Sequence, residues 1–203
     1  MKNSVRTILK IAVIGFMATA VAVVSCNKIP SESVQGTLSW NFSSRLSTRS
    51  VLDLPDTDAF VLTVKNSTGE ILYEGTYGDS PESILVNPGS YTVKAVSRKF
   101  DKPEFSAPQF GDEQVVVVQA GKSAKARLNC TQLNSGVRLK IDPDFKSVYP
   151  DGSIKVASSD GELGYSLTEK RIGYFNPGNV SVVMNDGSSS SVLLTRFLDP
   201  CEI

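Results

Sequence analysis

Short segments in which apolar and polar residues alternate run along almost the whole chain. Examples are "AFVLTVKN" near residue 60, "SYTVKAVS" near residue 90 and "VSVVMN" near residue 180. A period of two residues is typical of strands with one buried face, and turn-forming Gly, Pro, Asn and Asp separate the segments. After residue 25, sustained helical spacing of apolar residues is absent, and "PDFKSVYPDG" offers one helical turn at most. The pattern predicts an all-β chain of antiparallel sheets packed as β-sandwiches.

Two sequence motifs occur twice, in the same order. "LTVKNSTGEI", residues 62–71, matches "IKVASSDGEL", residues 154–163, and "VNPGSYTV" from Val86 matches "FNPGNVSV" from Phe175. The offsets are 92 and 89 residues, a difference of one short loop. Repetition at a fixed spacing indicates related structural units. We therefore expect two tandem antiparallel sandwich domains, at residues 34–131 and 132–203, with chance similarity of strand-turn-strand segments as the alternative.

The repeated Asn-Pro-Gly sequence is expected to turn the chain at sheet corners. Pro88 fits the second position of a type II turn and Gly89 the third, where φ is positive. Pro177 and Gly178 repeat this arrangement. The four residues are interpreted as structural turns, and valine at Gly89 is expected to destabilise the first domain.

The N-terminus has the profile of a signal peptide. Three basic residues, Lys2, Arg6 and Lys10, precede fourteen uncharged apolar or small residues at positions 11–24. At about 1.5 Å per residue the run would span roughly 21 Å, short of the bilayer core of about 30 Å. Residues 23–26, Val-Val-Ser-Cys, resemble the bacterial lipobox. We expect a lipoprotein signal peptide at 1–25, lipid attachment at Cys26 and a tether over 26–33; an ordinary secretory leader with an incidental cysteine is the alternative.

Removal of the leader changes the charge of the chain. The sequence has 21 basic and 21 acidic residues, and the leader takes three basic and no acidic ones, which leaves a net charge of −3. A mildly acidic chain has no electrostatic footprint for nucleic acid. Its expected partner through the anchor is the outer membrane. The residues after Cys26 lack the acidic cluster expected of a surface-export signal, so the periplasmic face is favoured over the cell surface.

Two further cysteines follow the leader, Cys130 and Cys201. Disulfides form in the compartments that exported proteins reach. Cys130 also fits a small buried apolar residue at the end of an alternating segment. Pairing and two free thiols both remain open.

Catalytic chemistry has little support in the sequence. The chain contains no His, which removes the commonest general base and the commonest zinc ligand, and it has no Gly-rich phosphate loop. Carboxylate pairs occur in "DLPDTD" and "IDPDF", where they could hold calcium or serve a glycosidase. Acids beside Pro are also usual in turns. We expect no enzyme, no cofactor and no metal.

Several stretches together resemble one family. The lipobox, "GTLSW", "ILVNPGSYTVKAVS" and the stretch from Phe100 to Cys130 are similar to exported lipoproteins of Bacteroidota grouped as domain of unknown function 4493, over residues 36–187. The Pro-Gly-x-Tyr element is also similar to those of transthyretin-like and fimbrial-subunit sandwiches. The resemblance implies Ig-like or transthyretin-like sandwiches and supplies no activity.

The segment of residues 97–113 is the longest stretch of the first domain without a strand pattern. It contains Phe100, Phe105 and Phe110 at five-residue intervals. A recognition loop on a rigid scaffold is one interpretation. The other is a crossover between sheets whose aromatic side chains close the end of the core.

Two functions remain open. The first is a lipid-anchored, non-catalytic envelope protein with a binding or adhesion surface for a glycan, a peptide or an envelope partner. The second is a subunit or anchor of a fimbria-like assembly that uses strand exchange. Only 25 residues follow Gly178, against 41 from Gly89 to Cys130, so the second domain would have an unpaired edge. Arg45 and Arg49 follow the first expected strand, where arginine-specific proteolysis could release it.

Replacement of the lipidated residue tests the expected anchor. In a Cys26→Ser variant no thiol is present for lipid attachment, so we expect the protein to leave the membrane fraction. Fractionation of carbonate-washed membranes measures this. A variant that stays fully membrane-bound would contradict the lipobox interpretation.

Overall fold

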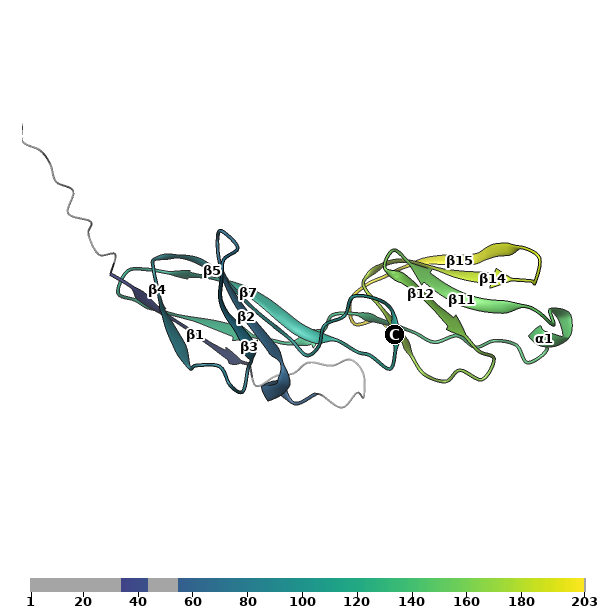
Figure 1. Cartoon of the computed structure of the whole chain (residues 1–203), viewed down its shortest axis with the longest axis horizontal. Coiled ribbons are helices and arrows are strands. Elements are labelled where there is room, and N and C mark those ends of the chain that lie inside the picture. Colours follow the sequence, from purple (N-terminus) through teal and green to yellow (C-terminus); the bar gives the residue numbers. More distant parts are fainter. Residues whose placement is uncertain (1–33, 44–54, 203) are drawn as a thin grey trace, which may run out of the picture. The chain divides into compact units, whose positions relative to one another are not determined.

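The computed structural model of the chain describes residues 34–43 and 55–202. These residues form four β-sheets that pack as two sandwiches (Figure 1), which confirms the all-β prediction. The helical elements described are one 3-10 turn, η1 (Thr57–Ala59), and the short helix α1 (Phe145–Val148). In the described part of the chain, no helix has the length and apolarity to cross a bilayer.

The first sandwich consists of a three-stranded sheet, β4-β1-β8, facing a five-stranded sheet, β3-β2-β5-β7-β9. The strands are β1 (Gly36–Phe42), β2 (Val61–Asn66), β3 (Ile71–Thr76), β4 (Ser83–Val86), β5 (Gly89–Val96), β7 (Phe110–Val118), β8 (Ser123–Leu128) and β9 (Thr131–Gln132). All pairs are antiparallel except β1 and β8, which run parallel. The expectation of wholly antiparallel sheets is therefore wrong at this pair. β8 follows β7 of the facing sheet, so no hairpin joins it to β1, and it enters the small sheet parallel to β1.

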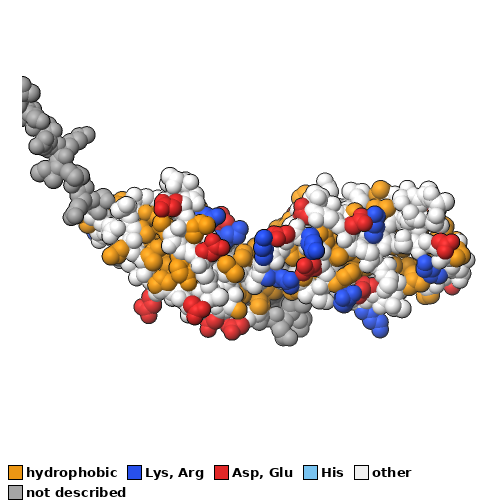
Figure 2. All heavy atoms as spheres, viewed as in Figure 1, with side chains coloured by type: hydrophobic (Ala, Val, Ile, Leu, Met, Phe, Trp, Pro, Cys, Tyr) orange, Lys and Arg blue, Asp and Glu red, His pale blue; other side chains and the backbone are white. Residues whose placement is uncertain are grey.

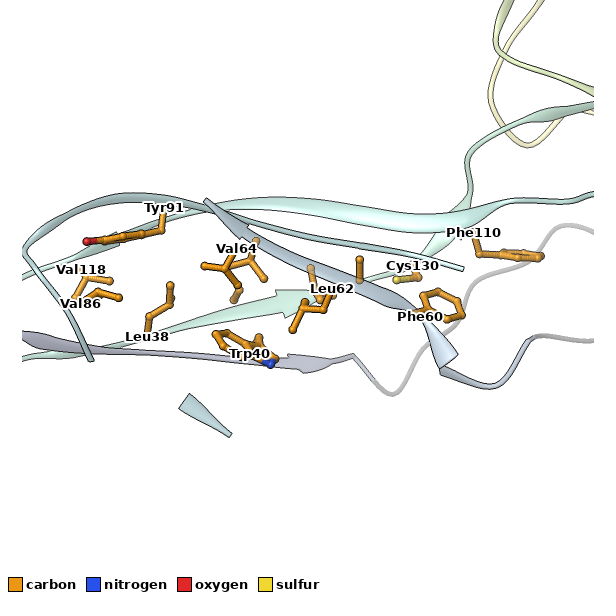
Figure 3. Packing of buried hydrophobic residues seen from close by; sticks show 14 residues of the cluster. Leu38, Trp40, Phe60, Leu62, Val64, Val86, Tyr91, Phe110, Val118 and Cys130 are labelled. Atoms are coloured by element: carbon orange, nitrogen blue, oxygen red, sulfur yellow. The ribbon is translucent and has the colours of Figure 1, made fainter. Parts of the chain in front are cut away.

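Alternate side chains of these strands form the first core. Successive residues of a strand point to opposite faces, so β1 buries Leu38 and Trp40 while β2 buries Leu62 and Val64. Figure 3 shows these side chains between the two layers of strands. Trp40 also donates its indole N–H to Ser80 Oγ at 3.1 Å, which satisfies the one polar atom of this side chain.

The second sandwich consists of a four-stranded sheet, β12-β11-β14-β15, and a three-stranded sheet, β10-β13-β6. The strands are β6 (Glu104–Phe105), β10 (Ser135–Val137), β11 (Ser153–Ser158), β12 (Gly161–Tyr165), β13 (Gly173–Phe175), β14 (Gly178–Asn185) and β15 (Ser190–Leu198). Among the described residues its cluster of buried apolar side chains is smaller, with five residues against fourteen in the first. The second sandwich thus has less core with which to stabilise itself.

The two sandwiches share one strand plan. The order β3-β2-β5-β7 of the first reappears as β12-β11-β14-β15 in the second. The registers agree as well, since Val64 lies opposite Val93 and Val156 lies opposite Val182. In the smaller sheets, the neighbours β4 and β1 correspond to β13 and β10. Residue 131, the expected end of the first domain, lies in β9.

The Asn-Pro-Gly sequences form corners between sheets, but not as type II turns. Pro88 joins β4 to β5 and Pro177 joins β13 to β14, and in each case the two strands belong to different sheets. The prediction of a positive φ at Gly89 is wrong, because this residue lies outside the left-handed region and already pairs with Val118 as the first residue of β5. Gly178 has a φ of +140°, far from the value of about +80° in a type II turn.

The two corner glycines should respond differently to alanine. At Gly178 the positive φ strains any L-residue although a Cβ would meet no atom within 4 Å, so Gly178→Ala should destabilise the second sandwich by about 1–3 kcal/mol. At Gly89 a Cβ would lie 3.8 Å from the Tyr91 ring, an ordinary contact. Gly89→Ala should therefore have little effect.

Urea unfolding followed by circular dichroism measures both variants, and fluorescence of Trp40 reports the first sandwich separately. Equal losses of unfolding free energy in the two variants would contradict the assignment of backbone strain to Gly178 alone.

Candidate functional site

The two small sheets differ beside their first strand. In the first sandwich β1 lies between β4 and β8. In the described part of the second sandwich, β10 has β13 on one side and no strand on the other, and β6 pairs with the far side of β13. One edge of β10 is therefore open where the first sandwich has β8.

The turn that leads into β8 is reproduced at this edge. In the first sandwich, the N–H of Thr37 donates to the carbonyl of Lys122 at 3.0 Å, and β8 begins at the next residue. In the second, the N–H of Gly136 donates to the carbonyl of Glu202 at 2.7 Å. Glu202 follows the end of β15 by the same four residues that separate Lys122 from the end of β7. The position of Glu202 thus marks the start of the open edge.

The residues that follow β10 retain the pattern of an edge strand. Val137, Leu139 and Ile141 are half-buried and pack against the second core, whereas Arg138 and Lys140 are exposed. Strand pairing ends at Val137 in the second sandwich, although the equivalent part of β1 is paired with β8 to its last residue. Residues 138–141 therefore have the side-chain alternation of a strand, and no described strand pairs with them.

A groove of about 210 Å³ lies on the inner side of this edge. It is lined mainly by apolar side chains of the edge and of the facing sheet, among them Leu139, Val156, Val180, Val182, Leu194 and Leu198. Leu194 remains 57% exposed. In the first sandwich the inward side chains of β8, Ala126 and Leu128, are at most 1% exposed and complete the core. The groove is thus a part of the second core that no described residue covers.

Arg196 occupies an inward position next to the groove. It lies opposite Val180 in β15, and the equivalent residue of β7, opposite Tyr91, is Val116. The guanidinium forms an ion pair with the carboxylate of Glu202. Burying an ion pair costs desolvation energy, and the Arg196 side chain avoids this cost by remaining 63% exposed. A charged group at this position fits a groove that is open to water.

Tyr165 holds β10 against the larger sheet. Its hydroxyl donates to the carbonyl of Val137 at 2.9 Å. Burial, with a further contribution from the charge of Glu169, raises the pKa of Tyr165 to about 12. The hydroxyl therefore remains a donor throughout the physiological pH range and keeps the edge in place.

The three phenylalanines of the segment 97–113 lie inside the protein. Phe110 is 1% exposed in the first core, and Phe100 is 8% exposed in a small cluster with Tyr174. Phe105, in β6, packs against the second core, with its ring centroid 5.1 Å from that of Tyr165 in an edge-on arrangement. The recognition-loop interpretation is corrected accordingly, because these side chains fill cores instead of facing a ligand.

The remaining predicted residues do not join the groove. Cys26, Arg45 and Arg49 lie outside the described residues. Both described cysteines are free thiols. Burial, followed by the nearby charge of Asp112, raises the pKa of Cys130 to about 12, and Cys201 Sγ contacts the carbonyl of Gln132 at 2.7 Å.

The carboxylates of the two acidic turns bind backbone. Asp56 accepts the N–H of Asp58 at 3.0 Å, and Asp142 accepts the N–H of Asp144 at 2.9 Å. Over residues 34–43 and 55–202, no three His, Cys, Asp or Glu side chains gather in a group that could hold a metal ion. These acids thus act as turn residues.

Sequence reasoning missed Arg196 and Glu202. No sequence pattern marks them, because the equivalence of Lys122 and Glu202 follows from the ends of β7 and β15 and from two backbone hydrogen bonds.

Comparison with known proteins gives a family. A family model described as "Domain of unknown function (DUF4493)" matches residues 35–192. No curated protein matches the chain.

Solved structures of Bacteroides proteins are similar to this chain. A candidate polysaccharide-binding protein from Bacteroides thetaiotaomicron has a TM-score of 0.39 and 11% identity, with 79% of each chain covered. A candidate cell adhesion protein from the same organism has a TM-score of 0.39 and 9% identity, with 82% of this chain and 88% of that chain covered. A candidate adhesin from Bacteroides ovatus has a TM-score of 0.38 and 10% identity, with 85% and 80% covered.

Thiol labelling distinguishes the two described cysteines. The thiolate is the reactive form of cysteine, and Cys130 is buried with a pKa raised to about 12. In the folded Cys26→Ser protein at pH 8, we expect Cys201 to react with a maleimide well before Cys130. Mass spectrometry of the peptides measures the order, and a disulfide between the two or equal labelling rates would contradict it.

Proposed function

Since the chain belongs to the DUF4493 family, whose description names no activity, we propose from its structure that it is a non-catalytic binding or adhesion protein of the bacterial envelope. The observation that carries this proposal is the open edge of the second sandwich. There, residues 138–141, which are exposed or half-buried and have no described partner strand, lie beside an apolar groove. An unpaired sheet edge beside exposed apolar surface is a binding surface that proteins use repeatedly.

The charge distribution agrees with a protein or glycan partner. On the face shown in Figure 2, Lys and Arg side chains are intermixed with Asp and Glu side chains. Ion pairs on the surface, such as Lys94 with Glu113 and Lys155 with Glu162, show the same mixture. Nucleic-acid-binding proteins carry a basic patch or stripe, whereas the chain after the leader has a net charge of −3, so the proposal includes no nucleic acid.

The proposal places the protein on the outer membrane through a lipid on Cys26. The support is the leader and lipobox pattern of residues 1–26. Several acyl chains, each worth about 0.8 kcal/mol per buried methylene, give a stable anchor. The periplasmic face is proposed in preference to the cell surface because no acidic export cluster follows Cys26.

A subunit or anchor of a fimbria-like assembly is the second candidate, and the position of β1 favours it. This strand lies between β4 and β8 and buries Leu38 and Trp40. Release of β1 by cleavage after Arg45 or Arg49 would open a groove in the first sandwich also. A strand from a neighbouring subunit could then replace it.

Arginine-specific proteolysis separates the two candidates. A tethered binding protein should stay monomeric before and after treatment, since β1 would remain held by its pairs with β4 and β8. Light scattering of the Cys26→Ser protein over a range of concentrations measures this. Oligomers that grow with concentration and increase after cleavage would support the assembly subunit instead.

The same protein should bind saturably to a glycan array or to immobilised envelope peptides without changing them. Release of new reducing ends from a bound glycan would contradict the non-catalytic part of the proposal. Absence of saturable binding to either class would contradict the binding part.

A further inference from the structure

We propose that the open edge of β10 binds one extended segment of a different polypeptide, with apolar residues at alternate positions and acidic residues between them. The segment runs parallel to β10, with its apolar side chains in the groove. This inference rests on the proposed binding function and specifies the chemical class of the partner.

The first sandwich shows what such an edge binds. There β8 lies parallel to β1, with six residues of each strand paired from Thr37 to Phe42. The inward residues of β8 are Ala124, Ala126 and Leu128, which belong to the first core or pack against it. Since the two sandwiches share the same strand plan, the partner of β10 is expected to be about six residues long, with small or aliphatic residues at every second position.

The backbone donors of the open edge follow from the same comparison. The N–H groups of Thr37 and Ser43 donate to carbonyls at the two ends of β8, and alternate N–H groups of a strand point to the same side. The N–H of Gly136 is equivalent to that of Thr37 and faces the open edge. Val137 is the last paired residue of β10. If the same alternation continues past it, the N–H groups of Arg138 and Lys140 are directed to the same side, where a parallel partner strand would accept from them.

The charges at the edge distinguish the partner from β8. In the first sandwich Ser39 and Asn41 lie opposite Lys125 and Arg127 of β8. The equivalents of Ser39 and Asn41 in the second sandwich are Arg138 and Lys140, both exposed.

Like charges directly opposite each other destabilise a strand pair and opposite charges stabilise it. A partner with basic residues at these outward positions is therefore disfavoured, and acidic residues are favoured.

The same basic pair disfavours a second copy of this chain at the edge. Pairing of two β10 edges would bring Arg138 and Lys140 of both copies together. The groove is also lined mainly by aliphatic side chains, and the edge offers backbone donors in strand spacing, which match a polypeptide better than a glycan. A strand of another protein with alternating apolar and acidic residues would fill the groove, accept hydrogen bonds from the backbone N–H groups and pair with the basic side chains.

Calorimetric titration of the Cys26→Ser protein with synthetic peptides tests the proposal. The first peptide has the sequence of residues 122–129, and the second carries Lys125→Glu and Arg127→Glu. We expect the acidic peptide to bind about tenfold more tightly, with the difference decreasing at high salt. A third peptide, acidic and with Ala126→Asp in addition, should not bind because it places a charge in the groove.

Two protein variants provide matched controls. Arg138→Ser combined with Lys140→Asn installs the residues of β1 and should remove the preference for the acidic peptide while retaining binding. Lys140→Pro removes a donor that faces the open edge and should abolish binding of both peptides. An unchanged thermal unfolding curve of the free Lys140→Pro variant shows that the fold is retained, since proline is tolerated on an open edge.

Three results would overturn the inference. They are failure of the acidic peptide to bind, equal binding to the Lys140→Pro variant, and self-association of the unmodified protein that Lys140→Pro prevents. The last result would identify a second copy as the partner. If the first result is accompanied by saturable binding to a glycan, the inference is overturned and the proposed binding function stands.

Discussion

The pairing of β1 with β8 is the interaction on which the difference between the two sandwiches depends. Buried backbone N–H and C=O groups need partners, because each unpaired group costs free energy comparable to a lost hydrogen bond. In the first sandwich β8 satisfies the outer side of β1 and brings Ala126 and Leu128 into the core. In the second, the described residues provide the same turn up to Glu202 but no strand beside residues 138–141.

The lack of a described equivalent of β8 affects which side chains occupy the second sandwich. With no described strand over the groove, Leu194 is exposed and an arginine, Arg196, is accommodated at an inward position. The crossover segment compensates in part, since β6 adds a short strand to β13 and Phe105 packs against the second core. The second sandwich is therefore stabilised from the side of β13 and remains open on the side of β10.

Much of the fold could be predicted from the sequence because period-two alternation and Asn-Pro-Gly corners are local signals. The alignment of Val86 with Phe175 holds in the structure, where each precedes its corner and ends a strand. The parallel pairing of β1 could not be read in this way, because the direction of a pair depends on which sheet the chain enters. The φ at Gly89 was mispredicted because β5 already begins at this residue. The burial of Phe105 depends on contacts with residues about sixty positions away, which a local sequence pattern does not reveal.

The candidate edge was only partly predictable. The alternation of apolar and basic residues over 137–141 is visible in the sequence, but the open side of β10 required the strand order. Arg138 and Lys140 can be identified as edge residues only through their equivalence to Ser39 and Asn41, which the pairing registers establish.

Native-state amide hydrogen exchange tests the central claim most directly, because the amides of β1 lie beside β8, whereas the equivalent amides of the second sandwich have no described strand beside them. The amides of Ser39 and Asn41, which face β8, should exchange slowly, and those of Arg138 and Lys140 should exchange rapidly in the free protein. Strong and equal protection at all four amides would show that the edge of β10 is already covered and would contradict the account.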